Sequence, residues 1–191
     1  IVHCAAKLRV AFKDQLLLFT FRTKSEGGKV ALAHEEYLHF IRTVLATDCA
    51  DLIDIEFFTA GAELPALIEE AHTAGAAVVC SSHDFHKTPP RAELVSRMVA
   101  MQRAGADLPK LAVMPQSRTD VLELLAATAE MADRHPETPI ITMSMGALGA
   151  VSRLSGEALG SAMTFANPGQ ASAPGQVSLE VVNEVLDALH L

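Results

Sequence analysis

Short apolar runs rich in β-branched and aromatic residues alternate along this chain with longer stretches in which apolar residues recur every three or four positions. The first pattern is typical of buried strands, and the second is typical of amphipathic helices. We predict strands over residues 16–21, 52–57, 77–82, 110–114, 140–145 and 162–165. Strands that alternate with helices in this way indicate repeated β/α units and a parallel sheet.

The helices between these strands have apolar stripes and recognisable ends. One stripe begins at Tyr37 and another at Leu64, each with apolar residues at three- and four-residue spacing. Ser117 followed by Asp120 has the spacing of a capping box, and Ser178 is placed to open the last helix. The pattern at the start of the chain is also helical but has no N-cap, so we expect further sequence before it.

The six β/α units favour a parallel barrel over an open sheet, because no glycine-rich dinucleotide fingerprint follows the first strand. A complete (β/α)8 TIM barrel typically has ~250 residues. This chain has 191 residues. We therefore predict an α/β protein, a TIM barrel whose first two strands are absent from the sequence. Residues 1–191 are expected to form a single barrel domain that is incomplete at its N-terminus.

Composition narrows the functional classes. The hydrophobic share of 50% predicts a globular chain with a large core and excludes disorder. The formal net charge is −8 and the 15 Lys and Arg residues form no run, so we expect no nucleic-acid surface. No apolar run reaches the ~20 residues that a membrane helix needs, and no signal peptide is visible. Three cysteines without close pairing indicate neither a disulfide framework nor a zinc knuckle, and they suit a reducing cytoplasm.

Lys110 is the candidate residue with the most specific chemistry. It lies between Pro109 and an apolar run, at the point where a strand is expected to enter the barrel. An amine among apolar and cationic neighbours stays neutral more readily than one in water, and a neutral amine can form a Schiff base with a carbonyl. The alternative is a lysine at the exposed end of the strand.

His83 lies one residue past a predicted strand and is followed by Asp84. A histidine there can transfer protons near neutral pH, or it can be a structural residue bonded to the backbone. His86, three residues on, suggests a metal site, but no third ligand stands at a recognisable spacing, so we expect no metal. Asp54 and Glu56 share one face of a strand, where they either act in catalysis or form a polar layer with a buried cation such as Arg22.

The other candidate site residues could each have an ordinary structural or solvent-exposed role instead. Glu26 is in a glycine-rich turn and could be a solvated acid, and Arg153 could be a charge on a helix face. The small-residue segment that contains Ser172 and Gln176 is either an ordinary loop or a lid over a polyhydroxylated ligand. Methionines at alternating positions of one strand are expected in the core or in a pocket wall; they are Met143 and Met145.

Six segments taken together resemble the type I 3-dehydroquinate dehydratases, the Schiff-base dehydratases of the shikimate pathway. The segments are LLFTFR followed by EGG, then DIE, VVCSSHDFHKTP, PKLAVMPQS, ITMSMG followed by SR, and ASAPGQ. Each is short, but their order and spacing make the combination specific. The resemblance runs from about Leu16 to the C-terminus.

This resemblance implies an activity and a set of roles. The activity is the conversion of 3-dehydroquinate to 3-dehydroshikimate and water, by syn elimination through a lysine Schiff base and without a metal or organic cofactor. The resemblance assigns imine formation to Lys110, general acid/base catalysis to His83 and support of that histidine to Glu26. It places Arg153 at the substrate carboxylate. The full set of implied substrate-binding residues is Arg22, Glu56, Met143, Met145, Arg153, Phe165, Ser172 and Gln176. A homodimer in the cytoplasm is also expected.

The resemblance is incomplete at the front of the chain, because the family has two earlier strands, the second with a Glu-x-Arg pair. We therefore expect this sequence to be part of a longer protein. Two other functions remain open. A class I aldolase would use a barrel lysine but would usually bind a phosphate, whereas the arginine, serine and glutamine set suits a carboxylate and hydroxyls. A non-catalytic sensor of quinate or shikimate would have an eroded site, and Lys110, His83 and Glu26 are all present.

Overall fold

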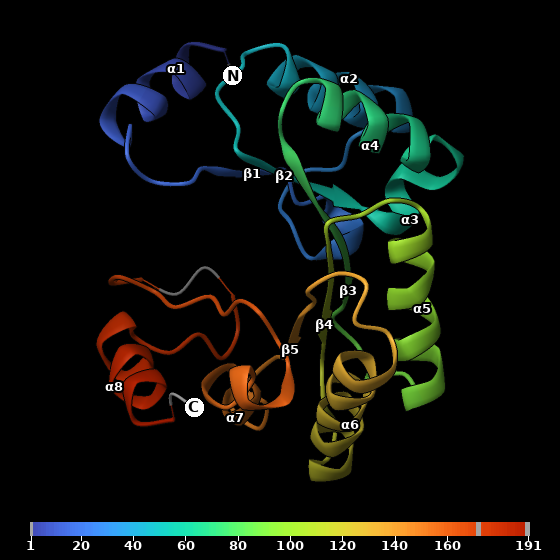
Figure 1. Ribbon diagram of the computed structural model, residues 1–191, viewed down its shortest axis with the longest axis vertical. Helices are drawn as coiled ribbons and strands as arrows, with labels where there is room; N and C mark the ends of the chain where they lie inside the picture. The colour runs from blue at the N-terminus through green and yellow to red at the C-terminus, as the bar shows by residue number, and fades with distance from the viewer. Residues whose placement is uncertain (1, 171–172, 190–191) are drawn as a thin grey trace. The chain divides into compact units, whose positions relative to one another are not determined.

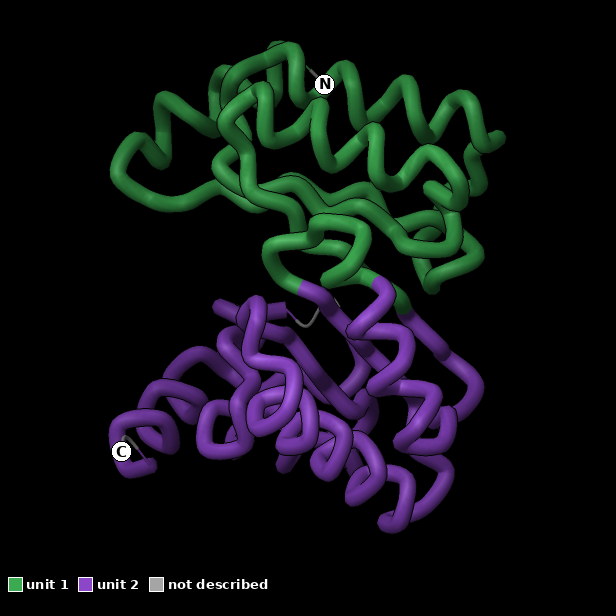
Figure 2. The backbone as a smooth tube through the Cα atoms, turned by 45° about the vertical axis from the view of Figure 1, so that its right-hand side comes forward, with its two compact units in different colours: residues 1–82, 101–108 green, residues 83–100, 109–191 purple. Residues whose placement is uncertain are grey.

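A computed structural model describes residues 2–170 and 173–189 (Figure 1). The chain divides into two compact units, which Figure 2 shows in different colours. The first unit comprises residues 1–82 and 101–108, and the second comprises residues 83–100 and 109–191. Three elements have residues in both units; they are β3 (Ala77–Asp84), α5 (Arg91–Arg103) and β4 (Leu108–Val113).

The first unit contains three parallel strands linked by helices. Strands β1 (Leu18–Thr20), β2 (Leu52–Glu56) and β3 are adjacent in that order, with Leu18 opposite Leu52 and Leu52 opposite Ala77. Its other elements are α1 (Val2–Ala11), η1 (Lys24–Glu26), α2 (His34–Leu45), α3 (Phe57–Ala60), η2 (Gly61–Glu63) and α4 (Leu64–Thr73). The predicted stripes of α2 and α4 are the buried faces of these helices, and Tyr37, Ile41 and Leu67 are inaccessible to solvent.

The second unit contains two parallel strands, β4 and β5 (Ile141–Ser144). Its other elements, after the first part of α5, are α6 (Arg118–Arg134), α7 (Ala150–Leu154), η3 (Glu157–Leu159) and α8 (Leu179–Leu189). The predicted caps are confirmed. The Asp120 N–H donates to Ser117 Oγ at the start of α6, and the Val181 N–H donates to Ser178 Oγ at the start of α8.

Five of the predicted strands are confirmed, with bounds that differ by at most two residues. β4 begins at Leu108, so Lys110 lies inside the strand and the prediction that it stands at the strand entrance is wrong. β3 extends to Asp84, so His83 lies inside that strand and not past its end.

The predicted sixth strand over residues 162–165 is wrong. Ser161 forms an isolated bridge, and the four residues after it have no regular structure. Side chains satisfy this edge of β5, because the Thr142 N–H donates to Ser161 Oγ and the Ser144 N–H donates to Ser152 Oγ. Two serine hydroxyls thus take the place that the backbone of a further strand would fill.

The cysteines at positions 4, 49 and 80 are free thiols. Within residues 2–170 and 173–189, no helix combines the length and the apolar character needed to cross a membrane. The expectation that residues 1–191 form one barrel domain stays a prediction.

Candidate active site

The predicted site residues belong to both units. Those in the first unit are Arg22, Glu26, Asp54 and Glu56, and those in the second are His83, Lys110, Met143, Met145, Arg153, Phe165 and Gln176. Ser172 and its neighbour Ala171 lie outside the described residues.

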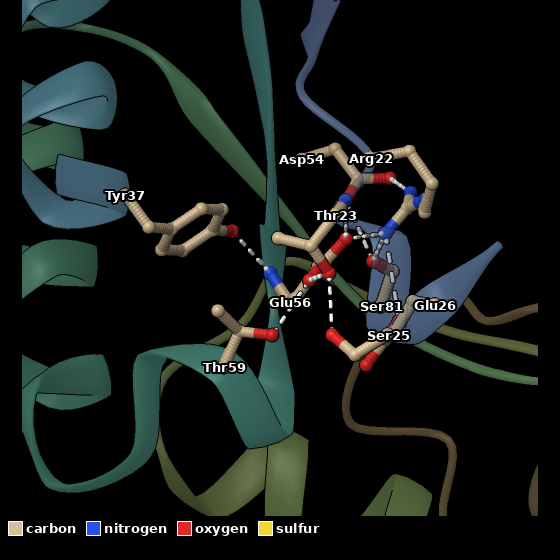
Figure 3. A network of polar contacts seen from close by, with 9 residues as sticks. All are labelled: Arg22, Thr23, Ser25, Glu26, Tyr37, Asp54, Glu56, Thr59 and Ser81. Carbon is tan, nitrogen blue, oxygen red and sulfur yellow. Dashed lines mark hydrogen bonds and ion pairs between the residues drawn. The ribbon is translucent and has the colours of Figure 1, made fainter. Parts of the chain in front are cut away.

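Arg22 is the centre of a polar cluster in the first unit (Figure 3). Its Nη2 donates to Asp54 Oδ2 at 2.7 Å, and its Nη1 donates to Glu56 Oε1 and to Ser81 Oγ, both at 2.9 Å. Glu26 Oε2 lies 3.6 Å from the same Nη1. Burial alone would lower the pKa of Arg22, but the three carboxylates raise it above its ordinary value. Asp54 and Glu56 therefore form a polar layer with Arg22, which was one of their two interpretations, although the structure shows this cation half-buried and not fully buried.

Glu26 ends the single turn of η1 and is only 5% exposed, so the solvated-acid alternative is wrong. Two glycines shape this turn. Gly27 has a φ of 91°, a conformation that residues with a Cβ disfavour. A Cβ on Gly28 would lie 1.8 Å from the Arg22 carbonyl oxygen. The chain can therefore fold back onto Arg22 and hold Glu26 beside its guanidinium.

Lys110 is the third residue of β4 and is only 6% exposed, which excludes the exposed-end alternative. Its Cα pairs with that of Ile141 on β5. The Nζ atom lies 4.8 Å from the centre of the Phe165 ring, so the predicted contact residue Phe165 touches the predicted nucleophile. A lysine side chain that lies against an aromatic face is attracted to it, so this contact helps to orient the amine.

His83 is half-buried near the end of β3, and His86 is exposed beyond it. Asp84 has a structural role, because its Oδ1 accepts hydrogen bonds from the backbone N–H groups of His86 and Lys87. In the described part of the chain, no group of three or more His, Cys, Asp or Glu side chains is placed to hold a metal ion.

Arg153 is only 2% exposed although it lies on the short helix α7, so the helix-face alternative is wrong. Its Nη1 donates to Met143 Sδ at 3.5 Å, and its Nη2 donates to the Pro174 carbonyl oxygen at 3.3 Å. Its Nε is buried and has no hydrogen-bond partner among the described residues. Burial lowers the pKa of Arg153 below its ordinary value. A buried guanidinium among neutral groups can receive an anion.

The remaining predicted residues of the second unit have varied surroundings. Met143 and Met145 are buried, as a pocket wall or core requires, and Met143 contacts Arg153. Gln176 is half-buried, and its backbone carbonyl accepts a hydrogen bond from Asn167 Nδ2. Arg153 also lines a cavity of about 210 Å³ together with Ser161 and Thr164.

Sequence reasoning missed five residues of the first-unit cluster, and one of them is Ser25, which contacts the Thr23 hydroxyl. Thr23 and Thr59 donate hydrogen bonds to the carboxylate of Glu56, Tyr37 accepts one from the Glu56 N–H, and Ser81 donates to Asp54. Hydroxyl residues are common in strands and turns, so their presence in a sequence signals no site. Only their proximity to the two acids reveals them.

Comparison with known proteins places this geometry in a family. The family model described as Type I 3-dehydroquinase matches residues 1–191. A curated Klebsiella pneumoniae protein named 3-dehydroquinate dehydratase is 50% identical over 189 residues, which cover 99% of this chain and 75% of that protein. A Salmonella agona protein of the same name is 48% identical over 190 residues, covering 100% and 75% of the two.

Solved structures agree with the sequence relatives. A type I 3-dehydroquinate dehydratase from Clostridium difficile, crystallised with covalently modified comenic acid, is 45% identical with a TM-score of 0.94 over 98% of this chain and 74% of that one. This likeness confirms the predicted α/β, TIM-barrel fold class. Since half of its residues are identical to those of a curated member and the family model spans residues 1–191, the chain belongs to the type I 3-dehydroquinase family.

Proposed function

We propose that this chain converts 3-dehydroquinate to 3-dehydroshikimate and water, with Lys110 as the Schiff-base lysine. The curated relatives carry the name of this activity at about half identity, so the chain is a hydro-lyase. The role of Lys110 is supported by one observation above all, the burial of its amine inside β4 against the Phe165 ring. Lysine side chains are rarely buried in proteins, so an interior amine beside an aromatic ring supports a chemical role.

The proposed reaction begins when the neutral amine of Lys110 adds to the ring ketone and water leaves, which gives an iminium. The positive charge of the iminium acidifies the adjacent C–H bond, and His83 removes that proton. The electron pair moves into an enamine and then expels the β-hydroxyl, which takes the proton from His83 and leaves as water. Water finally hydrolyses the product imine and frees Lys110. Because one histidine serves as base and then as acid, both groups leave from one face of the ring.

Substrate binding is proposed to depend on two arginines, the buried Arg153 and the half-buried Arg22. Arg153 would bind the carboxylate, because neither a partner for its Nε nor an acid that offsets its charge is found among residues 2–170 and 173–189. Arg22 would be the second substrate-binding arginine, and Glu26 would support His83. The other proposed substrate contacts are Met143, Met145, Phe165, Ser172 and Gln176, and Glu56 is proposed to act at the site by holding Arg22. No metal or organic cofactor is needed in this scheme, because the iminium itself accepts the electron pair.

Borohydride trapping tests the assignment of the lysine. Treatment with borohydride in the presence of 3-dehydroshikimate should reduce the imine to a stable secondary amine on Lys110, which peptide mass mapping would locate. Lys24→Ala and Lys87→Ala are matched controls at exposed lysines and should keep the label. A label on Lys24 or Lys87, or no label at all, would contradict the proposed nucleophile.

We further propose a homodimer, and a cytoplasmic location, which the three free cysteines suit. Size-exclusion chromatography with light scattering would test the first, since a dimer has twice the mass of the chain. Fractionation of the source cells would test the second.

A further inference from the structure

The carboxylate of Glu56 is completely buried and is fixed by four donors (Figure 3). Its Oε1 accepts from Arg22 Nη1 at 2.9 Å and from the Thr23 N–H at 2.8 Å. Its Oε2 accepts from Thr23 Oγ1 and Thr59 Oγ1, both at 2.6 Å. A carboxylate has about four lone-pair directions in total. Glu56 therefore has no acceptor direction left for a substrate hydroxyl.

The hydroxyl of Thr23 extends this network to the Glu26 turn. Because it has one hydrogen and donates it to Glu56, the 2.8 Å contact between Thr23 Oγ1 and Ser25 Oγ has Ser25 as its donor. Ser25 precedes Glu26 in η1. The orientation of Glu56 is thus coupled both to the Arg22 guanidinium and to the turn that carries Glu26.

Thr59 is the donor in this set that comes from outside the Arg22 segment. It lies in α3, the single turn that follows β2, three residues after Glu56. Without its hydroxyl, Oε2 would keep only the Thr23 hydroxyl, and the carboxylate could rotate away from Nη1. The Glu56 backbone is held separately, because its N–H donates to Tyr37 Oη at 2.8 Å.

We propose that Thr59 is a positioning residue, which orients Glu56 so that Glu56 holds Arg22 in place for the substrate. Glu56 then acts through Arg22 and does not itself contact the substrate. This inference rests on the proposed role of Arg22 in substrate binding, and it replaces direct substrate binding as the function of Glu56.

Thr59→Val tests the inference because it keeps the shape of the side chain and removes the donor. We expect KM for 3-dehydroquinate to rise about threefold to tenfold, the equivalent of one hydrogen bond, with kcat within about twofold of wild type. Thr59→Ser keeps the donor and should restore KM. Thr47→Val is the matched control, since Thr47 is also half-buried but donates only to the Val44 carbonyl oxygen, and its KM should not change. An unchanged KM in Thr59→Val, or no rescue by serine, would overturn the inference.

A double variant of Thr59 and Arg22 shows whether Thr59 affects substrate binding through Arg22 or independently of it. In an Arg22→Ala background, Thr59→Val should raise KM no further, because the residue that it positions is gone. If the two substitutions together raise KM by the product of their separate increases, the inference is contradicted.

Crystal structures of the Thr59 variants give a result that does not depend on turnover. We expect the Glu56 carboxylate to rotate and its contact with Arg22 Nη1 to lengthen in Thr59→Val but not in Thr59→Ser. A Glu56 conformation unchanged in Thr59→Val would overturn the inference even if the enzyme is fully active. Failure of wild type to dehydrate 3-dehydroquinate, or a normal KM in Arg22→Ala, would instead contradict the proposed function.

Discussion

Arg153 differs from Arg22 and Arg42 in its charge environment. Arg22 contacts three carboxylates, and Arg42 pairs with Glu70 at the surface, whereas Arg153 contacts a thioether and a carbonyl oxygen. An uncompensated buried charge destabilises a fold. A carboxylate that binds there relieves this cost and also accepts charge-assisted hydrogen bonds.

Arg153→Ala should therefore raise KM for 3-dehydroquinate far more than it lowers kcat. We expect a rise of roughly 30-fold or more, since loss of one partner of a buried charge pair costs ~2–5 kcal/mol. Steady-state kinetics would measure it, with Arg42→Ala as the control at an exposed arginine. A ring ligand without the carboxylate should bind wild type and Arg153→Ala equally. If Arg153→Ala weakens the binding of both ligands to the same extent, Arg153 has a structural role only.

His83→Ala should lose most turnover but still form the imine. General acid/base catalysis contributes roughly 10²–10⁴-fold to a rate, so kcat should fall within that range. Borohydride trapping on Lys110 would show that the imine still forms. His86→Ala is the matched comparison at an exposed histidine, and its effect should be small. If His86→Ala loses more turnover than His83→Ala, the proposed role of His83 is wrong.

The sequence predicted a site residue where its residue type is unusual among its sequence neighbours. Lys110 stands out beside an apolar run, although its depth inside the strand did not follow from the sequence. Glu26 and Arg153 have ordinary contexts, and only the burial given by tertiary packing separates them from a solvated turn and a helix face. Thr59 carried no signal, because its role depends on the acid that precedes it by three residues.

At the scale of elements, a charged contact ties α1 to the strand region of the first unit. Asp51 Oδ2 accepts from the Leu17 N–H at 2.7 Å and pairs with the Arg9 guanidinium. Arg9 also donates to the Cys49 carbonyl oxygen at 3.0 Å. The Leu17 N–H and the Arg9 side chain lower the pKa of Asp51 below its ordinary value of 3.8.

This contact should make the attachment of α1 sensitive to acid. A carboxyl whose pKa is lower in the folded state stabilises that state fully above its unfolded pKa, and the stabilisation is lost as pH falls through the folded value. Hydrogen-exchange protection of α1 should therefore decrease relative to α4 below about pH 4. Asp51→Asn should show the decrease already at pH 7, while Asp14→Asn, at an exposed aspartate, should not. Equal protection of α1 in wild type and Asp51→Asn would contradict the prediction.

Elements were predictable wherever a periodic pattern was long enough. The stripes of α2 and α4 and the cap of α6 follow from spacing alone. Helices α3 and α7 are single turns, too short to show a period. The false strand at 162–165 is apolar like the true strands, and the serine side chains that satisfy the β5 edge cannot be distinguished in the sequence from serines elsewhere.

At the scale of the whole molecule, alternation of strands and helices was sufficient for the fold class. Each β/α unit has to bury a sheet face under a helix, and few architectures do so repeatedly. The division into compact units was not predictable, because β3, α5 and β4 run through it without a linker.

Ligand binding should stabilise the molecule as a whole. A ligand at 100 times its Kd adds about 2.7 kcal/mol to the free energy of unfolding, so 3-dehydroshikimate should raise Tm. Reduction of the imine should make this rise persist after dialysis in wild type. In Lys110→Met the rise should disappear on dialysis, and borohydride without ligand is the control for both proteins. A persistent rise in Lys110→Met would place the covalent bond elsewhere.

Because Lys110 lies within β4, the face of the sheet to which the proposed nucleophile points depends on the exact number of residues before it in the strand. Successive side chains of a strand point to opposite faces of the sheet. One residue inserted between Leu108 and Lys110 would turn the amine to the opposite face if the pairing of the earlier residues were kept. Two inserted residues would restore the face but move the amine by about 6.6 Å along the strand. Substitutions around Lys110 can be tolerated one at a time, whereas insertions and deletions in this strand should be absent from active homologues of any length.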